Sequence, residues 1–293
     1  MKYTIPSFIK VNLTLRVTSR KDDGFHELVS LFVRLPSQEL LTINCSDNNN
    51  VKDIIETSNV VIHGENILSR VLSKVRDSGK DLPFMDIQIL KSIPPGTGLG
   101  AGSGNAAALI AFLKERYNVE LSDEALKSIG SDVCFFEKST GVSIVSGVGD
   151  RVENIPACID KKICLFVPRW RSDTGRAYAG LDELYGSNSF PSDPQKAREE
   201  AFSVIRGLER GEVLGLLPND FIPVLSGNYP EYERIFQICE NLGAQAWGIT
   251  GSGSAAFAIL DPGKEMFSFP EAGFEWVENI FITGVMINEG FQN

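Results

Sequence analysis

Histidine and cysteine, the side chains that most often bind zinc, are scarce in this sequence. It has two histidines, His26 and His63. The cysteines are odd in number and have no CxxC spacing: Cys45, Cys134, Cys158, Cys164 and Cys239. A tetrahedral zinc site is therefore not expected, and the cysteines are interpreted as reduced, structural thiols.

The sequence also lacks a long hydrophobic run and an excess of basic residues. No stretch of 18 or more apolar residues occurs, and residues 1–17 alternate polar with apolar types instead of opening on a hydrophobic block. We therefore expect no membrane span, no signal peptide and a cytoplasmic location. The net charge is −10 and no Lys/Arg cluster is present, which argues against a nucleic-acid partner.

The composition is that of an ordinary folded protein. The chain has 293 residues, of which 43% are hydrophobic and 23% charged, enough for two ordinary domains or one large one. The periodic pattern loosens over residues 154–161, just before a segment typical of a strand. We therefore predict an N-terminal lobe over residues 1–157 and a C-terminal lobe over residues 158–293.

Periodicity and capping residues predict the main elements. Residues 9–17 alternate strictly, which predicts a half-buried strand with Lys10 and Asn12 together on the face away from the core. Further strands are expected over residues 85–93, 141–148, 161–168 and 254–260, and a surface connection over residues 46–54. Helices are expected over residues 65–76, 105–117, 123–129, from 194 onward and over 230–243. Ser122 is the expected N-cap of the third of these, so Asp132 falls just past that helix.

The strongest signal for chemistry is the segment PPGTGLGAGSGNAAALI at residues 94–110. Alternate glycines let the backbone approach a ligand and adopt positive φ, so that successive N–H groups can converge on phosphate oxygens. The helix that follows adds its positive end. The segment is not a Walker A loop, because GxxxxGK[ST] is absent, and the short GxGxx[GA] pattern within it is weak. A purely structural glycine turn is the alternative interpretation.

This segment resembles the phosphate-loop motif PxGxGLGxSS of the GHMP kinases. It is most similar to the form PxGxGLGGGSSNAA of the branch acting on 4-diphosphocytidyl-2-C-methyl-D-erythritol, with Ala101 and Gly104 as departures where that branch prefers glycine and serine. Residues 6–28, PSFIKVNLTLRVTSRKDDGFHEL, resemble PAKINLxLxVxGxRxDGYHEL of the same branch. Residues 129–150 resemble GADVPFFxxGGxAxxxGxGE, with Ser131 and Cys134 as departures, and residues 249–260 resemble the third family motif, a GSG turn.

The resemblance implies an α+β, two-lobed GHMP kinase fold. The N-terminal lobe would be like ribosomal protein S5 domain 2, and the C-terminal lobe would be ferredoxin-like. It implies an enzyme, monomeric or weakly dimeric, that uses ATP and Mg²⁺ to phosphorylate the 2-hydroxyl of the diphosphocytidyl substrate in the non-mevalonate isoprenoid pathway. Two alternatives stay open: a GHMP kinase for mevalonate or homoserine, and a catalytically silent nucleotide-binding regulator.

The resemblance also implies roles for individual residues. Asp132 would be the general base and Lys10 its charge partner, although alone an Asp after a helix is usually a cap and a strand Lys is usually exposed. Residues implied to bind ATP and its phosphates are Pro95, Gly96, Gly98, Leu99, Gly100, Ala101, Gly102, Ser103, Gly104, Asn105 and Asn66, with Ser103 also offering its hydroxyl to Mg²⁺. Residues implied to bind the alcohol substrate are Asn12, Phe25, His26, Thr174, Gly251, Ser252 and Gly253. Of these, Phe25 and His26 would stack on the cytosine; a core aromatic and a loop histidine are the alternative.

Overall fold

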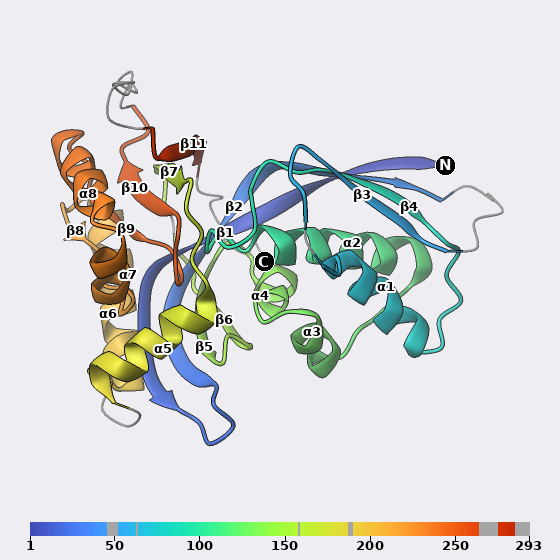
Figure 1. The fold of residues 1–293 in the computed structure, drawn as a ribbon, viewed down its shortest axis with the longest axis horizontal. Coiled ribbons are helices and arrows are strands. Elements are labelled where there is room, and N and C mark those ends of the chain that lie inside the picture. The colour runs from blue at the N-terminus through green and yellow to red at the C-terminus, as the bar shows by residue number, and fades with distance from the viewer. Residues whose placement is uncertain (46–51, 63, 158, 187–189, 264–274, 285–293) are drawn as a thin grey trace. The chain divides into compact units, whose positions relative to one another are not determined.

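The structure is a computed structural model that describes residues 1–45, 52–62, 64–157, 159–186, 190–263 and 275–284 (Figure 1). Most of the predicted connection over residues 46–54 lies outside this part of the chain, as do His63 and Cys158. The described residues form a mixed α/β protein with two sheets, which confirms the α+β fold class. None of its helices in this part of the chain is both long enough and apolar enough to cross a membrane.

The chain divides into two compact units, each built from segments that are separate in the sequence. Unit 1 comprises residues 1–9, 36–95 and 100–138; unit 2 comprises residues 10–35, 96–99 and 139–293. The two long N-terminal strands, β1 (Lys2–Arg20) and β2 (His26–Asn44), contribute residues to both units. The boundary between residues 157 and 158 stays a prediction.

Unit 1 packs helices against a sheet. Its further elements are β3 (Ile54–Ser58), α1 (Ile67–Asp77), β4 (Asp86–Leu90), α2 (Ala101–Tyr117), α3 (Asp123–Ile129) and α4 (Val133–Lys138). Strand β4 pairs antiparallel with the second half of β2, with Leu40 opposite Leu90, and parallel with β3. The helices lie together on one side of β3 and β4 (Figure 1). Helix α1 buries Leu68, Val71, Leu72 and Val75, the spacing of a single helix face.

Unit 2 contains a five-stranded sheet in the order β11-β7-β10-β9-β8. Its elements are β5 (Val142–Gly147), β6 (Arg151–Asn154), β7 (Lys162–Pro168), α5 (Thr174–Tyr185), α6 (Pro194–Glu209), β8 (Gly215–Leu216), α7 (Ile222–Asn228), α8 (Glu231–Asn241), β9 (Ala246–Ile249), β10 (Ala256–Leu260) and β11 (Val277–Gly284). Strand β7 lies between β11 and β10 and is antiparallel to both, and Phe166 faces Ala256 across the pairing with β10. Strand β5 pairs antiparallel with β6 and with the first half of β2.

Most of the predicted elements are confirmed, with differences at the ends of helices. Ser122 caps α3 by accepting from the N–H of Ala125, and Asp193 caps α6 in the same way. Helix α2 begins at Ala101, four residues before the predicted start. Gly102 and Gly104 are therefore helical, although glycine is a poor helix former. Helices α4, α5 and α7 have no counterpart among the predicted elements.

Candidate active site

Strand β1 carries Lys10 and Asn12, and both faces of the strand are buried there. Lys10 is 4% exposed and Asn12 is 2% exposed, and the apolar residues between and around them are equally buried. The prediction of a half-buried strand with a polar outer face is therefore wrong. The shared face of Lys10 and Asn12, which the two-residue period dictates, is covered by other parts of the chain.

Hydrogen bonds satisfy the two buried polar side chains. Lys10 Nζ donates to Asn12 Oδ1 at 2.5 Å and lies 4.7 Å from the centre of the Phe32 ring. Asn12 donates through Nδ2 to Ser30 Oγ at 2.9 Å and through its backbone N–H to Thr250 Oγ1 at 3.0 Å. Because a buried amine or amide without partners is costly, these contacts hold Lys10 and Asn12 in one orientation.

The first part of the glycine loop contacts the turn at residues 250–253 within unit 2. Gly98 has φ +74°, and a Cβ built on it would lie 2.3 Å from the carbonyl oxygen of Thr250 and 2.8 Å from that of Gly253. The N–H of Ser254 donates to the carbonyl of Gly96 at 3.2 Å. Only glycine fits position 98, for its backbone conformation and for the close approach.

The same turn reaches the polar residues of β1. A Cβ built on Gly251 would lie 3.4 Å from each of Lys10 Nζ, Asn12 Oδ1 and the carbonyl oxygen of Gly98. Three segments remote in the sequence, namely strand β1, the glycine loop and the GSG turn, therefore meet at one place in unit 2.

Thr174 lies at the edge of this cluster as the first residue of α5. Asp173 caps the helix by accepting from the N–H of Arg176 at 2.8 Å. The Thr174 hydroxyl and the Ser252 hydroxyl are 3.0 Å apart, within hydrogen-bond distance. Two residues predicted from separate motifs are thus in contact.

The predicted cytosine-stacking pair is divided between an exposed and a buried side chain. Phe25 is 65% exposed, whereas His26 is 8% exposed. His26 Nε2 lies 2.8 Å from Asp182 Oδ1, and its ring stacks on Tyr178 with the ring centres 4.5 Å apart. Tyr178 and Asp182 are not among the site residues predicted from the sequence. The signal was their spacing from Thr174, because residues 174, 178 and 182 share one face once a helix starts at Thr174.

In unit 1, helix α2 presents an uncapped N-terminus. Gly100, the N-cap residue, has φ +64°, and it provides no side-chain hydrogen bond to the first N–H groups. A helix end of this kind, with the helix dipole behind it, favours anions. Ser103 is in the first turn, and its Oγ would lie 3.4 Å from a Cβ built on Gly130. The loop serine and the segment before Asp132 are therefore close together within unit 1.

Two further predicted residues in unit 1 have structural positions at helix ends. Asp132 is half-buried and directly precedes α4, and its carbonyl accepts from the N–H of Phe136 at 3.3 Å. Asn66, predicted to contact the nucleotide, caps α1 by accepting from the N–H of Leu68 at 3.0 Å. Among the described residues, no group of three or more His, Cys, Asp or Glu is arranged to hold a metal ion.

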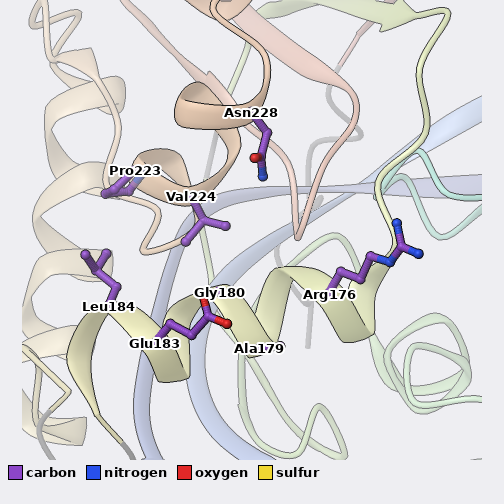
Figure 2. Close-up of a pocket in the computed structure, with 8 residues that line it drawn as sticks. All are labelled: Arg176, Ala179, Gly180, Glu183, Leu184, Pro223, Val224 and Asn228. Carbon is purple, nitrogen blue, oxygen red and sulfur yellow. The ribbon is translucent and has the colours of Figure 1, made fainter.

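A separate groove of about 600 Å³ lies between α5 and α7 (Figure 2). Figure 2 shows Arg176 and Glu183 on the α5 side and Asn228 on the α7 side. These α5 residues are on the face of the helix opposite Thr174 and Tyr178, because residues two and five positions away point to the other side. None of the predicted site residues lines this groove.

Comparisons with known proteins give matches over nearly the whole chain. The family model for the GHMP kinases N terminal domain matches residues 66–150, and the model for the GHMP kinases C terminal domain matches residues 204–266. The 4-diphosphocytidyl-2-C-methyl-D-erythritol kinase of Thermosipho africanus is 32% identical over 281 residues, which cover 94% of this chain and 96% of that protein.

Two solved structures have the same fold as this chain. A crystal structure of a 4-(cytidine 5'-diphospho)-2C-methyl-D-erythritol kinase matches with a TM-score of 0.73 and 26% identity, covering 97% of this chain and 98% of that one. A homoserine kinase from Cytophaga hutchinsonii matches with a TM-score of 0.66 at 14% identity, covering 97% and 95% of the two chains. At that identity the second match supports the fold alone.

Proposed function

The chain belongs to the GHMP kinases, and from this premise we propose that it uses ATP to phosphorylate the 2-hydroxyl of 4-diphosphocytidyl-2-C-methyl-D-erythritol in the non-mevalonate isoprenoid pathway. The observation that carries the proposal is the meeting of β1, the glycine loop and the GSG turn around Lys10 and Gly98. The name shared by the Thermosipho relative and the 26% identical crystal structure supports the choice of substrate. A cytoplasmic location, a monomer or weak dimer, and a lobe boundary at residues 157 and 158 belong to the same proposal.

The phosphates of ATP bind to the glycine loop and to the start of α2. Gly96, Gly98 and Gly100 have positive φ, which turns successive N–H groups toward a common point. The N–H groups at the uncapped end of α2 add partial positive charge where the phosphates carry negative charge. Backbone N–H groups can therefore supply local positive charge in a protein whose net charge is −10.

The acceptor hydroxyl is deprotonated by Asp132 as it attacks the γ-phosphate. The proton passes to the Asp132 carboxylate, the new bond forms between the hydroxyl oxygen and phosphorus, and ADP leaves with the electrons of the broken P–O bond. The Lys10 ammonium, held by Asn12 and the Phe32 ring, stabilises the negative charge on the transferring group.

The alcohol substrate is held by Asn12, by the hydroxyls of Thr174 and Ser252 and by the backbone of the GSG turn. His26 binds the cytosine together with Phe25. The contacts of His26 with Asp182 and Tyr178 fix the plane of the imidazole ring. The exposed Phe25 ring is available to stack on the base.

The donor set near the loop suits Mg²⁺. Magnesium in kinases keeps several waters and binds through substrate phosphates and one or two protein oxygens, so it requires no cluster of carboxylates. The Ser103 hydroxyl in the first turn of α2 is the protein oxygen that we propose for it. When bound, the ion would neutralise negative charge on the phosphates of ATP.

The function is tested by coupled measurement of ADP release. We expect ATP turnover with the cytidine substrate, and a loss of kcat of about 10²- to 10⁴-fold in Asp132→Ala. Asp123→Asn is the matched control, because Asp123 is an exposed carboxylate nearby in the sequence whose ion pair with Lys138 is on the surface. This control should retain the wild-type kcat.

The same assay separates the rival functions. Faster turnover of mevalonate or homoserine than of the cytidine substrate would assign the chain to another GHMP kinase branch. ATP binding without turnover of any of the three alcohols would identify a silent nucleotide-binding protein. Equal kcat for the wild type and Asp132→Ala would remove Asp132 from the mechanism.

A further inference from the structure

A buried carboxylate in unit 1, that of Glu39 on β2, is tied to both flanks of the glycine loop. Glu39 Oε1 accepts from Lys91 Nζ at 2.8 Å, from the N–H of Ser92 at 3.1 Å and from the N–H of Ile93 at 2.9 Å. Its Oε2 accepts from Lys91 Nζ at 2.7 Å and from Asn105 Nδ2 at 2.9 Å. One carboxylate therefore receives five hydrogen bonds from residues on either side of residues 94–104.

The Glu39 carboxylate is buried, so it needs a full set of well-formed hydrogen bonds. Glu39 is 0% exposed and Lys91 is 2% exposed, and burial lowers the pKa of the Lys91 ammonium. Two charges in such a place are costly unless all their hydrogen bonds are made, and a pair of apolar residues of similar size would commonly be as stable. Stability alone does not account for an ion pair here, whereas a need to fix a position does.

The position that is fixed is the separation of the loop ends. Ser92 and Ile93 directly precede Pro94, and Asn105 directly follows Gly104. The helical end is also held from the other side, because a Cβ on Gly104 would lie 1.9 Å from the carbonyl oxygen of Phe8. With both ends fixed in this way, the N–H groups between them are held ready for an anion before one binds.

We propose that Glu39 is a positioning residue of the nucleotide site, holding the ends of the glycine loop at the spacing that phosphate binding requires. This proposal rests on the proposed function, because the anion concerned is the triphosphate of ATP. Glu39 acts through Ser92, Ile93 and Asn105. Its loss should therefore weaken ATP binding far more than binding of the alcohol substrate.

The test compares Glu39→Gln with the wild type in steady-state kinetics and in hydrogen exchange. We expect KM for ATP to rise at least about tenfold, because Glu39 orients the groups that bind ATP. KM for the cytidine substrate should change less than about twofold. We also expect faster amide exchange in peptides that cover residues 94–105, measured without nucleotide.

Asp53→Asn is the matched control within unit 1. Asp53 accepts from Arg76 at 2.6 and 3.0 Å and from the N–H of Met85 at 2.9 Å, so it is a paired carboxylate that also holds backbone, but at the start of β4. This variant should leave KM for ATP and exchange in residues 94–105 unchanged. A rise in KM for ATP equal to that of Glu39→Gln would overturn the proposal, because it would reflect a general loss of stability.

A second variant keeps the test decisive if Glu39→Gln does not fold. Glu39→Leu combined with Lys91→Met removes both charges, so no buried ion is left unpaired, and it still releases the loop flanks. Unchanged exchange in residues 94–105 in the folded double variant would overturn the proposal even if the kinase activity is confirmed. Absence of ATP turnover in the wild type would instead refute the proposed function, and this inference with it.

Discussion

Gly104 illustrates how a single residue can depart from a family motif for reasons of packing. The related branch prefers serine at this position, but here a Cβ would lie 1.9 Å from the carbonyl oxygen and 2.9 Å from the carbonyl carbon of Phe8. Both contacts are to backbone, which cannot rotate away. We expect Gly104→Ser to lower the free energy of unfolding by about 1–3 kcal/mol, the usual range for overpacking, measured by urea denaturation.

Gly102 provides the control for that prediction. It lies two residues earlier in the same helix, and a Cβ built on it would meet nothing within 4 Å. Gly102→Ala should therefore leave stability unchanged or raise it by up to about 1 kcal/mol through helix propensity. Equal destabilisation by the two substitutions would show that the approach of Phe8 to α2 is not as close as the structure has it.

Residue pairing along β1 was predictable from the sequence, but burial was not. The two-residue period of a strand is enough to place Lys10 and Asn12 on one face, and they do form a hydrogen bond. Their cover comes from Thr250, which is separated from Asn12 by 238 positions. No local pattern contains a contact of that separation, so a polar face read as solvent-exposed proved to be buried.

At the scale of elements, helix starts were predictable where a side chain makes the cap. Ser122 and Asp193 are acceptors whose chemistry is visible in the sequence, and both cap helices as expected. The N-cap of helix α2 is instead Gly100, which has no side chain, and the first turn of the helix contains glycines that favour loops. The residues at this end of the helix also lie in tertiary contact, Gly104 with Phe8 and Asn105 with Glu39, and such contacts are not visible in the local sequence.

Asn66 allows the roles of a helix cap and of a ligand contact to be separated. It caps α1, so Asn66→Ala should lower the free energy of unfolding by about 1 kcal/mol, whereas Asn66→Ser retains a capping oxygen and should be near wild type. If the side-chain amide also binds the nucleotide, as we predict, KM for ATP should rise severalfold in both variants. The measurements are thermal unfolding and steady-state kinetics on the same preparations.

Asn66→Ser is the informative variant of the two. A wild-type KM for ATP in this variant would assign Asn66 to the helix cap alone. A raised KM with unchanged stability would assign it to both.

At the scale of the molecule, the sequence predicts strands and helices but not which segments form a compact unit. Each unit here combines three separate segments, and residues 96–99 of the glycine loop belong to unit 2 while both flanks of the loop belong to unit 1. The family motifs indicate which segments carry the predicted site residues, because the reaction restricts the residue types in those segments. Their spatial grouping follows from long-range packing, such as the pairing of β7 with β10, residues 162–168 with residues 256–260.

The stability of the whole protein should fall steeply in alkaline solution because of thiols in the core of unit 2. Burial raises the pKa of Cys164 to about 12 and also raises the pKa of Cys239. Above about pH 9 the unfolded chain loses these protons while the folded chain keeps them, so the folded state binds more protons and stability decreases as pH rises. Each thiol should contribute about 1.4 kcal/mol of lost stability per pH unit in this range.

Cys164→Ala isolates one of the two thiols. Urea denaturation under reducing conditions at pH 8, 9 and 10 should give a smaller alkaline loss in the variant than in the wild type, by about 1 kcal/mol between pH 9 and 10. Lys91, whose pKa burial lowers, changes stability in the opposite direction, but equally in both proteins, so the difference between them reports the thiol. Identical pH profiles would mean that the Cys164 thiol is not sealed in the core of unit 2.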